Sequence, residues 1–201
     1  MFCIQWKHCK WNVHFSFFVL LAFCNLFSGI QNGGMLFSAI LLHESAHLLL
    51  MFLVGAKPEE VQLSALGMRI VLSGERQLGY LRRMWVSLAG PLMNLLLSGF
   101  FRLMQLDTLA SIHLLMGCFH LLPIEPMDGG AALRSFLSGL CSPAQGEKIS
   151  FAVSLLFLIP LSVLGFLLLL QTRNNLSLLV LSVYLMLYLL LKRRGTEDLA
   201  G

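Results

Sequence analysis

Two histidines and a glutamate form the strongest chemical signal in the sequence. His43, Glu44 and His47 occur in the order His-Glu-Ser-Ala-His. On an α-helix, positions four residues apart lie on one face, so both imidazoles can bind one zinc ion. Glu44 is then placed beside the metal, where a carboxylate serves as general base for an attacking water. The motif therefore predicts a hydrolytic zinc site.

The surroundings of this motif are strongly apolar. Of the 201 residues, 57% are hydrophobic and 12% are charged, whereas soluble domains have about 25% charged residues. This composition excludes a disordered chain and favours a membrane protein. Polar side chains inside an apolar helix are costly unless they are paired or coordinated. Metal binding is thus favoured over the alternative, in which these side chains hydrogen-bond between helices.

A third ligand is expected elsewhere, because a catalytic zinc usually has three protein ligands and one open position. The candidate is Asp128, in the segment His-Leu-Leu-Pro-Ile-Glu-Pro-Met-Asp-Gly-Gly at 120–130. Pro123 and Pro126 interrupt a helix here, and the two glycines allow backbone that a side chain would forbid. The alternative role of Asp128 is to cap a helix expected at 131–140.

The apolar runs predict an all-α polytopic membrane protein with about six transmembrane helices. The predicted spans are residues 13–30, 35–54, 84–101, 109–122, 150–170 and 176–191. The fourth run is short for a span and ends at Pro123, so we expect non-helical backbone beside it. Such backbone is stable at membrane depth only against protein or a wet cavity, as a hydrolytic site requires.

The distribution of basic residues orients the chain, because cytosolic loops are enriched in Lys and Arg. With the N-terminus in the cytosol, 12 of the 14 Lys and Arg residues lie on the cytosolic side, and only Arg102 and Arg173 lie outside. We therefore expect both termini in the cytosol. This topology accounts for the net charge of +4 without a nucleic-acid partner.

The loop at 55–83 shows a different pattern. Apolar and polar residues alternate on both sides of Leu66-Gly67, which predicts a small β-hairpin at the membrane surface between the second and third spans. Its edge could bind an extended substrate, or the hairpin could close the entrance to the site. The two roles are compatible.

Three motifs in this order resemble the site-2 protease family of zinc intramembrane metalloproteases. They are His43 to His47, then Gly90-Pro91-Leu-Met-Asn94, then Leu122-Pro123 through Asp128-Gly-Gly. The resemblance covers residues 10–140 and is greatest to the compact sporulation branch, which processes a membrane-held precursor of a sigma factor.

The resemblance implies one zinc ion per chain, with His43, His47 and Asp128 as ligands and Glu44 as the catalytic acid and base. It also implies cleavage of a membrane-spanning or membrane-associated proprotein, inhibitory membrane proteins as partners, and residence in a bacterial cell membrane. Asn94 is interpreted as a hydrogen-bonding residue that orients a ligand or the substrate.

Two residues depart from the family pattern. His120 stands where Asn is common, and we interpret it as a group that binds substrate or the oxyanion, or that acts as a spare metal ligand. Glu125 stands where an apolar residue or Pro is usual, and a contact with Arg134 is one explanation for it. Neither departure removes a predicted zinc ligand.

The remaining expectations concern organisation. We predict one membrane metalloprotease domain over residues 1–201, without an inserted PDZ-like domain or an appended CBS-like domain. His14 and His113 are interpreted as packed histidines. The N-terminal cluster of Cys3, His8, Cys9 and His14 matches no common zinc pattern, and its neighbours Trp6 and Trp11 read as interfacial anchors.

Two other functions remain as alternatives to a protease. One is a metal-binding membrane transporter without hydrolytic activity, and the other is an inactive relative that binds membrane proteins. Glu44 in the general-base position argues against both, and the spans show no transporter-like repeat.

Overall fold

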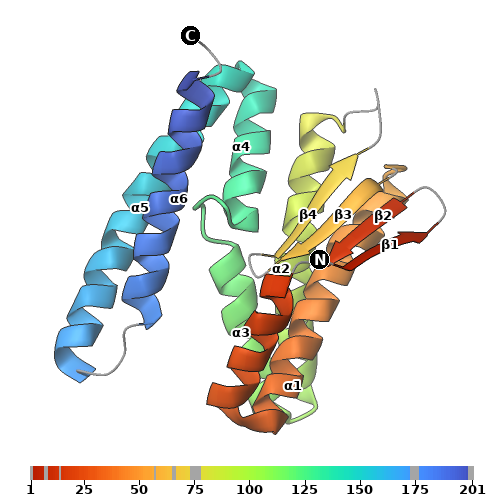
Figure 1. Ribbon diagram of the computed structural model, residues 1–201, viewed down its shortest axis with the longest axis vertical. Coiled ribbons are helices and arrows are strands. Elements are labelled where there is room, and N and C mark those ends of the chain that lie inside the picture. Colours follow the sequence, from red (N-terminus) through yellow and green to blue (C-terminus); the bar gives the residue numbers. More distant parts are fainter. Residues whose placement is uncertain are drawn as a thin grey trace. The chain divides into compact units, whose positions relative to one another are not determined.

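A computed structural model describes residues 2–6, 9–13, 15–56, 58–64, 67–72, 78–172 and 177–198. The chain divides into two compact units, Met1–Cys118 and Phe119–Gly201. Most of the described residues are helical, and the elements run in the order β1, β2, α1, β3, β4, α2, α3, α4, α5 and α6 (Figure 1).

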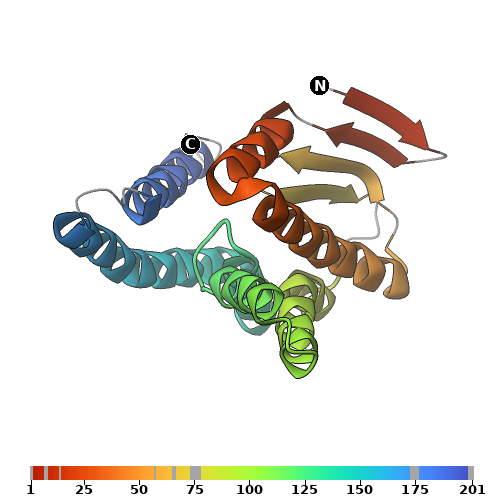
Figure 2. The same ribbon diagram turned by 90° about the horizontal axis from the view of Figure 1, so that it is seen from below.

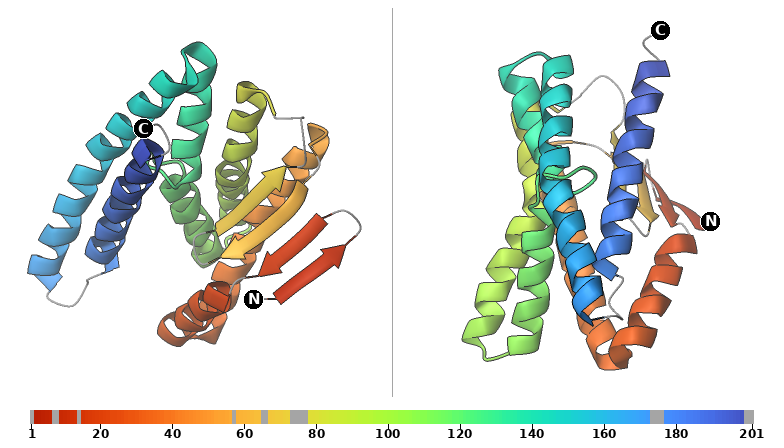
Figure 3. Two further views of the ribbon diagram at one scale, coloured as in Figure 1. Left: turned by 45° about the horizontal axis from the view of Figure 1, so that its top comes forward. Right: turned by 90° about the vertical axis from the view of Figure 1, so that its left-hand side faces the viewer.

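The first unit contains a mixed four-stranded sheet in the order β1-β2-β3-β4. Its strands are β1 (Phe2–Trp6), β2 (Cys9–Val13), β3 (Pro58–Ser64) and β4 (Gly67–Leu72). β1 and β2 are antiparallel, β2 and β3 are parallel, and β3 and β4 are antiparallel. Figure 3 (left) shows the four strands side by side.

Half of this sheet lies where a hairpin was expected, and the other half was not expected. β3 ends at Ser64, β4 begins at Gly67, and the two strands pair antiparallel where the residues alternate. β1 and β2 contain Trp6 and Trp11, which the sequence analysis interpreted as membrane anchors alone. The signal was present, because Phe2, Ile4 and Trp6 alternate with Cys3 and Gln5, which is the pattern of a strand.

Helix α1 (Phe15–Leu53) follows β2 directly and is helical throughout. Its ribbon turns back on itself between a red first part and an orange second part (Figure 1). The predicted spans at 13–30 and 35–54 lie largely within its two parts, and helical structure continues through the turn between them. α1 contacts both β3 and α2, and the sheet lies along one side of α1 (Figure 2).

Helices α2 (Tyr80–Leu103) and α3 (Asp107–His120) form an antiparallel hairpin. Arg102 near the end of α2 pairs with Asp107 at the start of α3. Further along, the hydroxyl of Ser98 donates to the carbonyl of Ala110 at 2.9 Å. α3 ends at His120, and the segment that follows is non-helical up to Met127, as the two prolines predict.

The second unit consists of α4 (Asp128–Leu140), α5 (Pro143–Thr172) and α6 (Ser177–Asp198). α5 contacts both α4 and α6, and α6 runs alongside α5 in Figures 1 and 3. Its core joins the non-helical segment to the long helices through four buried side chains: Ile124, Leu158, Leu185 and Leu189. The segment that precedes Asp128 is therefore fixed by packing.

Within the described residues, three helices are long and apolar enough to cross a membrane. They contain the stretches Asn32–Leu53, Tyr80–Leu103 and Pro143–Gln171, and a shorter apolar stretch lies at Leu178–Leu191. Large apolar side chains on these helices are exposed in the isolated chain, for example Leu96 and Phe52 at 72% and 78%. Lipid is the medium in which such a surface is stable, so the chain is a membrane protein.

Candidate metal site

His43 and His47 lie one turn apart on α1 and point to the same side. Both are buried, with 1% and 7% of their surface exposed. Their Nε2 atoms are 3.2 Å apart, and the two rings meet edge to face. The expectation that the two imidazoles share one face of a helix is therefore met by the geometry, and Glu44 follows His43 directly on the same turn.

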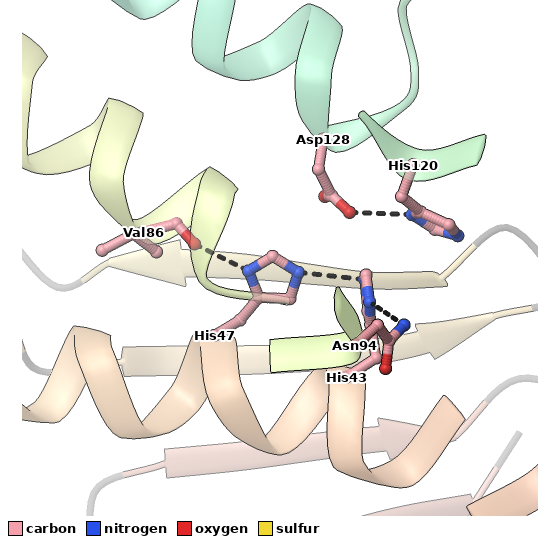
Figure 4. Close-up of polar contacts among 6 residues, drawn as sticks. All are labelled: His43, His47, Val86, Asn94, His120 and Asp128. Carbon is pink, nitrogen blue, oxygen red and sulfur yellow. Dashed lines mark hydrogen bonds and ion pairs between the residues drawn. The ribbon is translucent and has the colours of Figure 1, made fainter. Parts of the chain in front are cut away.

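Each ring is held through its other nitrogen. His47 Nδ1 donates to the carbonyl of Val86 at 2.7 Å, and Asn94 Nδ2 lies 3.0 Å from His43 Nδ1 (Figure 4). A carbonyl can only accept, so the proton of a neutral His47 is on Nδ1 and the lone pair is on Nε2. This is the tautomer that a metal ligand needs, and hydrogen bonds of this kind orient metal-bound histidines.

Gly90 explains how α2 comes close enough to hold both rings. A Cβ atom at this position would lie 2.3 Å from His47 Nε2 and 2.7 Å from His43 Nε2. Any side chain would therefore collide with the two nitrogens. Pro91 and Asn94 follow on α2, and both are buried. The Gly-Pro-x-x-Asn motif thus supplies space at its first residue and a hydrogen bond to His43 at its last.

The two nitrogens fit a shared zinc ion. Zinc binds imidazole nitrogen at about 2.0–2.1 Å with tetrahedral angles, which places two nitrogen ligands about 3.3 Å apart. The observed separation of 3.2 Å is close to this value. Two buried lone pairs at that distance repel each other unless a proton or a metal lies between them. The arrangement is therefore suited to a cation.

His113, which the sequence analysis interpreted as a packed residue, lies behind Asn94. It is fully buried on α3, and its Nδ1 is 3.0 Å from Asn94 Oδ1. Phe101 packs against its ring, with 5.2 Å between the ring centroids. Asn94 thus connects His43 on α1 to His113 on α3. No spacing rule reveals this contact, because it depends on how α2 and α3 pack.

In the second unit, Asp128 is the first residue of α4 and contacts His120. His120 Nδ1 donates to Asp128 Oδ2 at 2.7 Å (Figure 4). α4 begins at Asp128, earlier than the helix expected at 131–140, and its N-cap position is occupied by Met127. Asp128 is therefore in the first turn and is not the N-cap residue. His120 holds one oxygen of the carboxylate and fixes its orientation.

The two glycines after Asp128 allow the preceding segment to pack against α4. A Cβ atom on Gly129 would lie 2.2 Å from the carbonyl oxygen of Leu121, and one on Gly130 would lie 2.6 Å from the backbone nitrogen of Glu125. Ser154 on α5 secures the same segment, because it accepts from the Glu125 nitrogen at 3.2 Å and donates to the Pro123 carbonyl at 3.3 Å. Backbone geometry thus positions Asp128.

Glu125 forms an ion pair with Arg134, at 3.2 Å between Oε1 and Nε. The contact that the sequence analysis offered as one explanation for this residue is therefore present. The Glu125 side chain is 9% exposed and that of Arg134 is 43% exposed. A buried carboxylate needs such a partner. The pair attaches the segment before Asp128 to the second turn of α4.

The N-terminal histidines can be placed only in part. His8 and His14 lie outside the described residues, while Cys3 and Cys9 belong to β1 and β2. The interpretation of this cluster as unrelated to zinc therefore stays a prediction. Cys118 and Cys141 are free and exposed.

Comparison with known proteins identifies relatives named as zinc metalloproteases. No family model matches the chain. A protein of Methanocaldococcus jannaschii named zinc metalloprotease MJ0392 is 32% identical over 128 residues, which are 58% of this chain and 37% of the relative. Rip3 of Mycobacterium tuberculosis, also named as a zinc metalloprotease, is 31% identical over 124 residues, which are 54% of this chain and 31% of the relative. The chain thus spans about a third of the length of these relatives.

A solved structure has the same fold. It is the site-2 protease from Methanocaldococcus jannaschii, with a TM-score of 0.61, 22% identity and coverage of 92% of both chains. The apolar helices and the paired histidines define the class as a membrane metalloprotein. The chain is thus similar in sequence to two proteins named as zinc metalloproteases and similar in fold to a site-2 protease, and the relatives support zinc as its metal.

Proposed function

We propose that the chain is a zinc-dependent intramembrane endopeptidase. The observation that carries this proposal is the buried pair of Nε2 atoms, 3.2 Å apart, with Glu44 on the same helical turn. His43, His47 and Asp128 hold one zinc ion, and the two compact units together form one metalloprotease domain. Bound zinc would polarise the scissile carbonyl and acidify the attacking water.

The remaining chemistry belongs to side chains of the chain. Glu44 takes the proton from the attacking water and delivers it to the nitrogen of the leaving amine. Val86 and Asn94 keep the two imidazoles oriented, and His120 does the same for the Asp128 carboxylate. We further propose that His120 contacts substrate or the developing oxyanion.

The substrate class follows from the location of the site. A site carried by membrane helices acts on a membrane-spanning or membrane-associated protein whose peptide is extended, because helical amides are engaged in internal hydrogen bonds. The outer edge of β4 is suited to pair with such a peptide. A membrane-held transcription-factor precursor of the kind processed by the sporulation branch is the first candidate, with inhibitory membrane proteins as regulators.

The membrane arrangement is part of the same proposal. Six transmembrane helices, with both termini in the cytosol of a bacterial cell, place 12 of 14 basic residues on the cytosolic side. The two parts of α1, before and after its turn, would provide the first two spans. Helix α3 and the non-helical segment after it would provide the fourth span. Cysteine accessibility at Cys141, and at position 108 in a Thr108→Cys variant, tests this topology, because the proposal places the two positions on opposite sides.

Zinc content tests the site before any substrate is known. We expect about one zinc per chain in the detergent-purified protein, retained in Glu44→Gln and lost in Asp128→Ala. In proteoliposomes with tagged single-pass substrates, Glu44→Gln should abolish cleavage. A chain without zinc would contradict the proposal. Metal transport that persists in Glu44→Gln would favour the transporter, and zinc binding without cleavage of any substrate tested would favour an inactive relative.

A further inference from the structure

His113 stands out as a fully buried histidine that the proposed chemistry does not use. It lies in α3, and its Nδ1 is 3.0 Å from Asn94 Oδ1. Its Nε2 is buried without a hydrogen-bond partner in the described part of the chain. A buried polar atom without a partner is costly, and a Leu or Phe would fill this apolar space without that cost. The position of the imidazole therefore requires another explanation.

Asn94 has two amide groups to satisfy, and each faces a histidine. Its Nδ2 lies 3.0 Å from His43 Nδ1, and its Oδ1 lies 3.0 Å from His113 Nδ1. In the structure, these hydrogen bonds form a chain in which every donor faces the same way. His113 Nδ1 donates to Asn94 Oδ1, and Asn94 Nδ2 donates to His43 Nδ1. His43 Nε2 then donates to His47 Nε2, and His47 Nδ1 donates to the carbonyl of Val86. The neutral rings of His43 and His47 each donate through one nitrogen and accept through the other. The ring of His113 donates through Nδ1, but its Nε2 accepts no hydrogen bond from the described residues.

Zinc on His43 Nε2 requires the opposite order around Asn94. The proton of His43 must then be on Nδ1, and Nδ1 needs an acceptor. Asn94 provides one when its amide presents the oxygen to His43 and the nitrogen to the other side. The oxygen and nitrogen of an amide have nearly the same shape, so no packing changes. The amide nitrogen now donates toward His113, whose Nδ1 must accept.

We propose that His113 is a positioning residue for the metal ligand His43, and that it acts through Asn94. A neutral histidine can donate or accept at Nδ1, because its proton can be on either nitrogen. Without the metal, His113 Nδ1 donates to the Asn94 oxygen. With the metal bound and the amide turned, the same nitrogen accepts from the Asn94 amide nitrogen. This inference rests on the proposed zinc site and adds a residue of α3 to the support of a ligand on α1.

The test is zinc affinity, measured by competition with a chromophoric chelator on the purified full chain. We expect His113→Leu to bind zinc about 10–100-fold more weakly, the usual effect of losing a hydrogen bond behind a ligand. His113→Asn should bind zinc within about threefold of the unaltered chain, because the amide nitrogen and oxygen of Asn lie close to the position of Nδ1 in the histidine ring. His113→Gln, whose amide is one carbon farther out, should remain weak.

Ser98→Ala is the matched control. Ser98 is one turn from Asn94, is buried, and bonds α2 to α3 through Ala110, so its loss disturbs the same helix pair without touching His43. We expect its zinc affinity to be unchanged. If His113→Leu does not fold, the zinc affinities of His113→Asn and His113→Gln still test whether a hydrogen-bonding group at the position of Nδ1 supports zinc binding.

Three outcomes of the affinity measurements would overturn the inference. They are unchanged affinity in the folded Leu or Gln variant, an Asn variant as weak as the Gln variant, and equal weakening by Ser98→Ala. These outcomes are distinct from a failure of the proposed function, because that failure would appear as absence of zinc from the unaltered chain. Histidine ¹⁵N NMR adds a second readout, in which zinc should move the His113 proton from Nδ1 to Nε2. A tautomer that does not respond to zinc would contradict the proposal.

Discussion

Gly90→Ala is the substitution for which the structure gives the sharpest expectation. The new Cβ would lie 2.3 Å from His47 Nε2 and 2.7 Å from His43 Nε2. Ordinary contact begins at 3.4 Å, so the overlap with His47 is about 1 Å in a packed interior. Metal–ligand distances tolerate about 0.2 Å. His47 therefore cannot keep both its hydrogen bond to Val86 and its place beside His43.

The expected result is a zinc affinity at least about 10–100-fold lower, because displacing a ligand should weaken binding no less than losing a hydrogen bond behind a ligand does. Loss of helix stability cannot explain such a result, since Ala favours a helix over Gly by about 1 kcal/mol. The assay is chelator competition, with the melting temperature of the metal-free protein as a check on folding.

Gly99→Ala is the matched control, on the same helix. A Cβ at Gly99 meets nothing within 4 Å. We expect unchanged zinc affinity and a melting temperature that is equal or slightly higher. The reasoning is refuted if Gly90→Ala binds zinc as tightly as the unaltered chain, because the two rings would then have space that the structure does not show.

Three further predictions concern stability. Removal of zinc with a chelator should lower the melting temperature, because a ligand at 100 times its Kd stabilises the folded state by about 2.7 kcal/mol; an unchanged melting temperature would argue against a bound metal. Glu125→Gln should destabilise the chain by about 1–3 kcal/mol. A double-mutant cycle with Arg134→Gln should show coupling between the two paired residues. Additive effects of the two substitutions would contradict a stabilising role for the ion pair. Gly130→Ala should cost about 1–3 kcal/mol, since its Cβ would meet backbone of Glu125 at 2.6 Å; stability equal to that of Gly99→Ala would contradict this contact.

The sequence predicted the parts of the site that depend on local spacing. His43 and His47 share a face because a helix repeats every 3.6 residues, and Asn94 contacts His43 as its motif indicated. The proline pair after His120 predicted the non-helical segment. These features need only periodicity and the conformational limits of Pro and Gly.

Other features depend on packing between distant segments and have no local signal. The proximity of Gly90 to the two rings and the contact of His113 with Asn94 arise only when α1, α2 and α3 are together. The start of α4 at Asp128, instead of at residue 131, is of the same kind. Two glycines after Asp128 argued for irregular backbone, but their close contacts to residues 121–125 show that they serve helix packing.

The parallel pairing of β2 with β3 has a consequence for how the chain assembles. Asn12 in β2 hydrogen-bonds to Glu60 in β3, 48 residues later, and α1 lies between them in the sequence. β1 and β2 can pair as soon as both exist, but β2 cannot meet β3 until all of α1 has been synthesised. Closing a loop of this length is slow compared with forming a hairpin. Until β3 is synthesised, the β2 edge of the N-terminal hairpin is therefore unpaired as well as the β1 edge, and this temporary edge can pair with other chains during synthesis.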